Sequence, residues 1–130
     1  MKISALKERD SLEKRVALVP EIAKKLISNG HEVLIETGAG TASLFPNETY
    51  IEVGAKVSKL SKILEESDII LTVNMPSEDV LSLLKPNTNL IGLLNPHKNK
   101  DNLKLLAKRS VNVFSMEFIP RISRAQQIDA

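Results

Sequence analysis

The chain has 130 residues, enough for one domain of ordinary size, and its 18 basic and 16 acidic residues leave a formal net charge of only +2. The absence of cysteine excludes disulfides, thiolate metal sites and a cysteine nucleophile, and the near-neutral charge gives no reason to expect nucleic acid as a partner. No apolar run approaches the ~20 residues of a membrane span, and the charged start, Met1–Glu8, is not expected to be a signal peptide.

Strands and helices are predicted to alternate along the chain. The first strand is expected at 3–6, and Pro20 opens a helix that Gly30 ends, because proline suits the first helical position and glycine suits the end. The other strands are expected at 31–36, 55–58, 68–73, 89–94 and 111–116, and the other helices at 47–53, 60–66, 77–84 and 99–110. This alternation predicts an α/β fold, with an open, mainly parallel sheet and helices on both of its faces.

Gly38-Ala39-Gly40 follows the second predicted strand and invites comparison with a phosphate-binding loop. The dinucleotide fingerprint needs a third glycine three residues after the second, on the turn that leaves the first strand. Here Ser43 stands at that position, and the glycines follow the second strand. A plain turn is therefore the favoured interpretation.

Arg15 is a candidate anion-binding residue because it follows the first predicted strand. Ligands of open α/β sheets bind outside the carboxyl ends of the strands, where a guanidinium can hold a carboxylate through two parallel hydrogen bonds. A surface arginine paired with Glu13 or Glu8 is an equally good interpretation of the residues alone.

The remaining titratable candidates give weaker signals. His31 and His97 lack a second histidine or a spaced carboxylate cluster, so no metal site is predicted and both rings are expected to be solvated. Glu65-Glu66 is interpreted as a solvated helix end and not as an acid–base pair. No catalytic residue is assigned.

The segment from Pro120 to Ala130 carries the most informative pattern. Ser123 and Gln126 have the spacing of a capping box, which starts a helix at Arg124. Gln126 and Asp129 share a face of that helix, within reach of Arg121 in the preceding loop. This set of polar groups can hold a ligand such as a ribose and amide, or it can form a capped, solvated helix start.

The same helix signal raises the question of completeness. The chain ends about two turns after the cap, and isolated helices shorter than ~12–15 residues are marginal unless they are packed. We therefore expect residues 1–130 to be one subdomain that is cut within its last helix.

Several motifs together resemble those of one family. The whole chain is similar to the N-terminal part of the alpha subunit of proton-translocating NAD(P) transhydrogenase and, more distantly, to the N-terminal part of alanine dehydrogenase. The terminal Pro120–Gln126 motif is the most specific and is typical of the transhydrogenase branch. The other shared features are Lys7-Glu8, Arg15-Val16-Ala17 with Pro20, Gly30-His31-Glu32-Val33, Glu36-Thr37-Gly38-Ala39-Gly40, Gly54-Ala55 and Asp68-Ile69-Ile70-Leu71.

The resemblance implies a Rossmann- or flavodoxin-like first subdomain without the glycine fingerprint. In this family NAD(H) binds between that subdomain and a second, Rossmann subdomain, and NADH passes hydride to NADP(H) bound on a partner component, coupled to proton translocation. Arg121, Gln126 and Asp129 match the family residues that contact the nicotinamide side of NAD(H), and Gln127 and Ile128 lie in the same segment.

Two departures separate the chain from the dehydrogenase branch. Asn74 stands where alanine dehydrogenases carry a substrate-binding lysine, and their catalytic histidine falls near Asn95. Arg15 matches their carboxylate-binding arginine. Because an amide cannot act as the general acid or base, amino-acid oxidation is not expected.

The resemblance therefore predicts a transhydrogenase component that is inactive alone. Its expected partners are the remaining transhydrogenase components and a second copy in a homodimer, without nucleic acid and without direct membrane insertion. Its expected location is cytoplasmic, at the inner membrane face through partner subunits. Two alternatives stay open: a non-enzymatic remnant or small binding module, and a substrate domain like that of alanine dehydrogenase.

Overall fold

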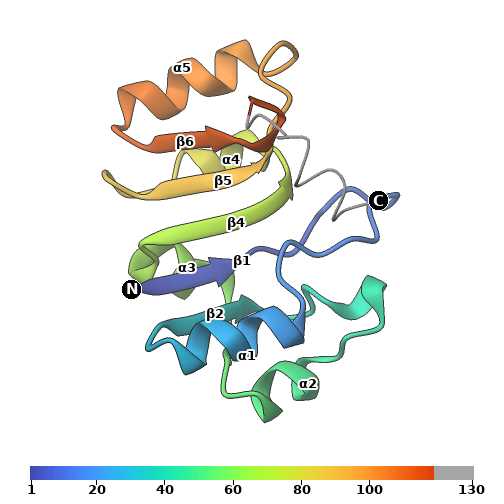
Figure 1. The fold of residues 1–130 in the computed structure, drawn as a ribbon. Coiled ribbons are helices and arrows are strands. Elements are labelled where there is room, and N and C mark those ends of the chain that lie inside the picture. The colour runs from blue at the N-terminus through green and yellow to red at the C-terminus, as the bar shows by residue number, and fades with distance from the viewer. Residues whose placement is uncertain (119–130) are drawn as a thin grey trace, which may run out of the picture.

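A computed structural model describes residues 1–118, which form one layered α/β unit (Figure 1). Its sheet has six strands, and every neighbouring pair is parallel. The strands are β1 (Lys2–Ala5), β2 (Glu32–Glu36), β3 (Lys56–Ser58), β4 (Ile69–Asn74), β5 (Asn89–Leu93) and β6 (Asn112–Ser115). Their order in the sheet, β3-β2-β1-β4-β5-β6, reverses between β1 and β4, which is the strand order of the Rossmann fold.

The helices connect successive strands. They are α1 (Pro20–Ser28), α2 (Asn47–Glu52), α3 (Leu60–Glu66), α4 (Glu78–Leu81) and α5 (Lys100–Lys108), with short 3-10 turns η1 (Thr41–Ser43) and η2 (Met116–Phe118). Pro20 occupies the first turn of α1 with Glu21 beside it, as the sequence predicts. Past the end of this helix, Gly30 takes a positive φ of 90°, a conformation that glycine adopts without a Cβ penalty.

Both faces of the sheet carry helices, which confirms the predicted fold class. Successive strand residues point to opposite faces, so Val33 and Ile35 join one core and Leu34 joins the other. The first core includes Ala23 of α1 and Tyr50 of α2. The second core collects buried residues from the other three helices: Ile63, Leu64, Val80, Leu81 and Leu106.

The fourth helix is shorter than predicted. The sequence predicts that it extends to Leu84, but α4 ends at Leu81. The amides of Leu83 and Leu84 donate to carbonyls three residues earlier, so the chain tightens into a turn. The cause is Pro86, because a proline disfavours helical geometry in the residue before it. Leu84 nevertheless stays fully buried.

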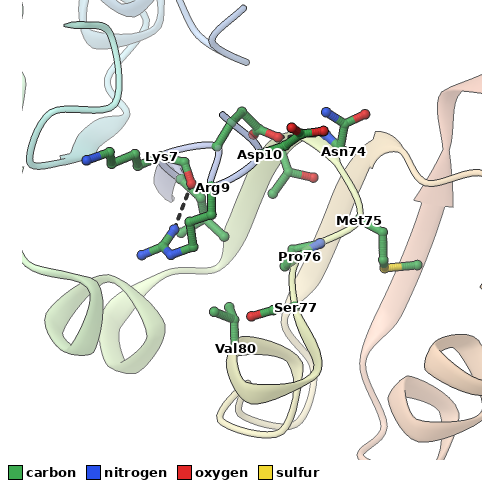
Figure 2. Close-up of a pocket in the computed structure, with 11 residues that line it drawn as sticks. Lys7, Arg9, Asp10, Asn74, Met75, Pro76, Ser77 and Val80 are labelled. Carbon is green, nitrogen blue, oxygen red and sulfur yellow. Dashed lines mark hydrogen bonds between the residues drawn. The ribbon is translucent and has the colours of Figure 1, made fainter. Parts of the chain in front are cut away.

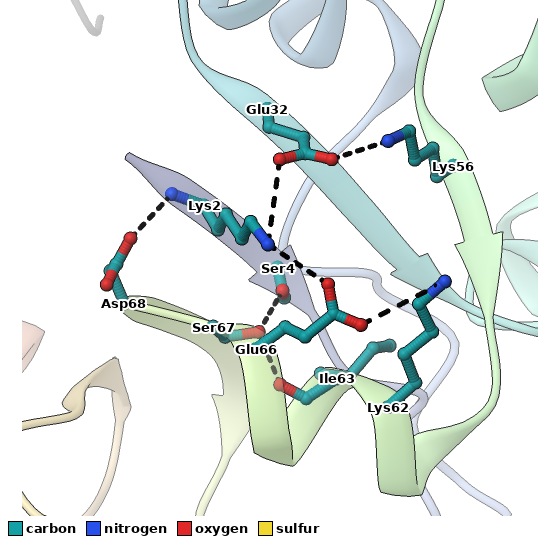
Figure 3. Close-up of polar contacts among 9 residues, drawn as sticks. All are labelled: Lys2, Ser4, Glu32, Lys56, Lys62, Ile63, Glu66, Ser67 and Asp68. Atoms are coloured by element: carbon teal, nitrogen blue, oxygen red, sulfur yellow. Dashed lines mark hydrogen bonds and ion pairs between the residues drawn. The ribbon is translucent and has the colours of Figure 1, made fainter.

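A polar cluster at the amino edge ties α3 to the sheet (Figure 3). The buried hydroxyls of Ser4 and Ser67 share a hydrogen bond, and Ser67 Oγ also donates to the carbonyl of Ile63 at 2.5 Å. Outside it, Lys2 Nζ lies 3.1 Å from Glu66. This pair explains Glu66 as an ion-pair partner at a helix end, in line with its interpretation from sequence.

Candidate functional site

The carboxyl edge of the sheet is where the fold directs attention. Open α/β sheets bind ligands there, at the point where strand order reverses, and in this sheet that point lies between β1 and β4. A cavity of about 230 Å³ opens at this point (Figure 2). Its walls come from the segment after β1 and from the end of β4 with the turn that leads to α4: Leu6, Lys7, Glu8, Arg9, Asp10, Thr72, Asn74, Met75, Pro76, Ser77 and Val80.

Glu8 fastens the segment after β1 to the end of β4. Its two carboxylate oxygens accept the backbone N–H groups of Val73 and Asn74, each at 2.9 Å. Two amides that could face a ligand at the strand end are thereby used within the chain.

Glu36 plays the same part at the end of β2. The carboxylate is buried, accepts the N–H of Lys7 at 2.8 Å, and is held by both terminal nitrogens of Arg9 at 3.1 and 2.5 Å. In dinucleotide-binding Rossmann domains an acidic residue after the glycine turn accepts the ribose hydroxyls. Here a two-pronged arginine occupies the carboxylate instead.

Glu13 gathers the polar groups around Arg15. Arg15 Nε and Nη2 each lie 2.9 Å from the Glu13 carboxylate, and Asn74 Nδ2 donates to the same group at 2.8 Å. The hydrogen bonds from Arg15, followed by that from Asn74, lower the pKa of Glu13 from 4.5 to about 2. The structure thus shows Arg15 both at the carboxyl edge and paired with Glu13, which joins the two interpretations that the sequence left open.

The glycine segment is a turn, as predicted. Gly38 has a positive φ of 80°, and its N–H donates to Asn47 Oδ1 at 2.9 Å. A Cβ at Gly40 would lie 2.7 Å from the Tyr50 ring, so this glycine is required for close packing. Tyr50 is fully buried and its hydroxyl donates to the carbonyl of Leu18 at 2.7 Å.

The start of α1 also does not suit a phosphate. A helix N-terminus binds anions through free N–H groups and its positive dipole end, but Pro20 lacks an N–H and Glu21 adds a negative charge. Together with the occupied Glu36 carboxylate, this means that residues 1–118 do not fit a dinucleotide by themselves.

The other sequence candidates lie apart from this edge or carry no ligand set. His97 is exposed as expected, but His31 is half-buried with an Nδ1 that has no partner among the described residues, which corrects its expected solvation. No cluster of three metal-ligating side chains occurs within residues 1–118. Asn95 adopts a φ of 46°, and its N–H donates to Glu117 at 2.8 Å.

The five candidate cofactor contacts, Arg121, Gln126, Gln127, Ile128 and Asp129, lie outside the described residues. Conversely, the sequence patterns do not single out Arg9 and Glu36. The position of Glu36 at the end of a predicted strand is the one available signal, since that is where the Rossmann fold places its acidic residue.

These features define an α/β domain with Rossmann strand order in which the chain's own side chains occupy the dinucleotide positions. Residues 4–130 match the family described as alanine dehydrogenase/PNT, N-terminal domain. The chain belongs to this family.

Individual relatives favour the transhydrogenase branch. The chain is 40% identical to an NAD(P) transhydrogenase subunit alpha protein of Rickettsia prowazekii, across all of the chain and 35% of that protein. The crystal structure of a transhydrogenase from Sinorhizobium meliloti superimposes with a TM-score of 0.91 at 35% identity, covering 99% of this chain and 39% of the other. Alanine dehydrogenase of Bacillus subtilis is 43% identical over 76 residues, which is 58% of the chain and 20% of that protein.

The chain therefore spans about a third of the length of the first of these relatives. In the part of the chain that the structure describes, none of the helices has the length and apolar character to cross a membrane.

Proposed function

We propose that this chain is the first subdomain of the NAD(H)-binding component of an NAD(P) transhydrogenase, and that it is inactive alone. The observation that carries the proposal is a match over the whole chain to transhydrogenase alpha subunits that are about three times longer. The occupied carboxyl edge supports it, because Glu36 and the start of α1 leave no dinucleotide site within residues 1–118.

The division of labour follows from the chemistry. Hydride transfer between two nicotinamides is the cofactors' own reaction, and a protein contributes binding, orientation and exclusion of water. We propose that NAD(H) binds only when a Rossmann domain completes the site, with NADP(H) on a partner component. Arg121, Gln126 and Asp129 then contact the nicotinamide side, with Gln127 and Ile128 in the same segment.

The proposed partners are the remaining transhydrogenase components and, by the family resemblance, a second copy of the chain. Such a component would be cytoplasmic and would reach the inner membrane face through its partner subunits. Amino-acid oxidation is not proposed. Asn74 is an amide already bonded to Glu13, and an amide supplies no general acid or base.

The test is a reconstitution assay. The chain is mixed with the remainder of a transhydrogenase alpha subunit and with the NADP(H)-binding component, and hydride transfer from NADH to an NADP+ analogue is followed. We expect no turnover by the chain alone and turnover by the mixture. Gln126→Ala should lower the mixture's turnover by roughly tenfold or more, because a misoriented ring loses much of the positional advantage.

Lys104→Ala is the matched control, since Lys104 is exposed on α5 and lies outside the proposed contacts. Turnover by the chain alone would contradict the proposed dependence on partners. A silent mixture, in which the other two components are active with a native alpha subunit, would reject the transhydrogenase role and favour a non-enzymatic module.

A further inference from the structure

One half of a sheet face lacks a covering helix. Strand register places six apolar residues side by side across the whole sheet on the face that carries α1 and α2: Val57, Ile35, Ala5, Leu71, Ile91 and Phe114. Ile35 and Ala5 are completely buried beneath the helices, whereas Phe114 at the outer strand is 52% exposed. Figure 1 shows α1 and α2 over one end of this face and no helix of the described residues in front of β4 to β6.

The uncovered half contains a groove of about 350 Å³. We call open face the five large apolar residues Leu71, Ile91, Leu93, Phe114 and Met116, four of which line this groove, with Phe114 beside Ile91 in register. Leu93 and Met116 are 39% and 44% exposed. Parallel sheets are normally covered on both faces, and an apolar patch of this kind marks an interaction surface.

The other face of the same strands shows that missing cover, and not composition, is the cause. Leu34, Ile70 and Leu90 lie on that second face and belong to one core with residues of α3, α4 and α5. Their exposure is 1% or less. The exposed residues of the open face are of the same apolar type but have no comparable layer above them within residues 1–118.

The open face is bounded and nearly uncharged. Towards the amino ends of β5 and β6 the same face turns polar, because Asn89 and Asn112 pair in register and their side-chain amides hydrogen-bond at 3.1 Å. The one charged side chain lining the groove is Arg15, and its charge is balanced by Glu13 at 2.9 Å. Two copies of this surface would therefore meet without like-charge repulsion.

We propose that a second copy of this chain covers the open face in a two-fold dimer. The face is self-complementary, because it carries an exposed aromatic knob, Phe114, next to an apolar groove. In a two-fold interface the same patch serves both partners, so each Phe114 enters the groove of the other copy. This proposal goes beyond the transhydrogenase role and stands or falls independently of nucleotide binding.

The test is the oligomeric state of the full chain, measured by sedimentation over a range of concentrations. We expect a reversible monomer–dimer equilibrium. Phe114→Gln should raise the dimer dissociation constant by at least about tenfold, since a central aromatic anchor supplies much of an interface's affinity. Leu83→Gln is the matched control, because Leu83 is 63% exposed and follows α4, on the opposite face.

Side-chain labelling gives a second readout that identifies what covers the face. Oxidative labelling of Phe114 and Met116 should fall as concentration rises, while labelling of Leu83 stays constant. Met116→Gln replaces Phe114→Gln if the first variant does not fold. A dimer that both variants leave intact would overturn the proposal. So would a monomer at every concentration, with Phe114 protected if the chain's own residues cover the face or accessible if a different partner does.

Discussion

Asn74 controls the electrostatics of the carboxyl edge through one hydrogen bond. Its amide donates to Glu13, which also pairs with Arg15, so the three side chains together carry no net charge. An additional cation in place of the amide would leave this group positive and suited to a carboxylate ligand. The dehydrogenase branch, which it resembles less closely, has a lysine at the corresponding position. The neutral amide therefore accounts for an edge that holds its own carboxylate.

Removing Arg15 is predicted to raise the pKa of Glu13 from about 2 most of the way to its ordinary 4.5, because the Arg15 hydrogen bonds are the largest cause of the depression. Asn74→Ala should raise it by less, since that hydrogen bond is the second cause. Carboxyl chemical shifts of Glu13 followed by NMR against pH would measure both. A larger rise in Asn74→Ala than in Arg15→Ala would refute this order of causes.

Residues of this edge were predictable only where their partners are close in sequence. The pairing of Arg15 with Glu13 is one of two interpretations of the residues alone, because the partners are two positions apart. The bonds from Glu8 to Asn74 and from Arg9 to Glu36 join residues 66 and 27 positions apart. Only the order of strands in the sheet brings such residues together, and no local pattern encodes that order.

Elements were predicted well where apolar residues follow one another in a strand. The predicted bounds of β4 and β5 lie within one residue of the observed ones, because fully covered strands appear as continuous apolar runs. Helix ends were less predictable. The early end of α4 reflects a proline five residues beyond Leu81 and a compact turn whose geometry depends on the packing of Leu84.

The short helix α2 is held by one side chain, and Gly40→Ala tests this. A Cβ there would lie 2.7 Å from both the Tyr50 ring and the carbonyl oxygen of Phe45, so one of them must move. Overpacking of this kind destabilises by about 1–3 kcal/mol. The loss should appear as a lower midpoint of urea unfolding. Ala42→Ser, at an exposed position of the same turn, is the control and should change it little.

A Gly40→Ala midpoint equal to that of the parent chain would show that Tyr50 yields without cost. That result would remove the structural reason for glycine at this position. It would also reopen the comparison of Gly38-Ala39-Gly40 with a ligand-binding loop.

At the scale of the whole molecule, the sequence predicts layers but not their completeness. The βα alternation predicts a parallel sheet with helices on both faces, and the structure confirms it. The alternation does not state how far each helix reaches across the sheet. Because α1 and α2 pack over one end of their face, Leu93 and Phe114 stay exposed at the other, and only the three-dimensional arrangement reveals this.

The whole fold is predicted to lose stability at high pH through its single tyrosine. Burial raises the pKa of Tyr50 from 10 to about 12, so the folded state retains the hydroxyl proton that the unfolded chain releases. The resulting contribution to the free energy of unfolding is complete below pH 10 and is lost as pH rises through about 12. The raised pKa values of Lys2 and Arg15 act in the same direction.

Thermal unfolding followed between neutral pH and pH 12 measures this loss, and tyrosinate absorbance reports on Tyr50 alone because the chain has one tyrosine and no tryptophan. Tyr50→Phe should start from a lower stability, by about 1–3 kcal/mol, since the Leu18 carbonyl loses its partner. Its alkaline decline should then be shallower than that of the parent chain. Tyrosinate that forms near pH 10 in a chain that is still folded would contradict a buried, hydrogen-bonded Tyr50 and with it the docking of α2.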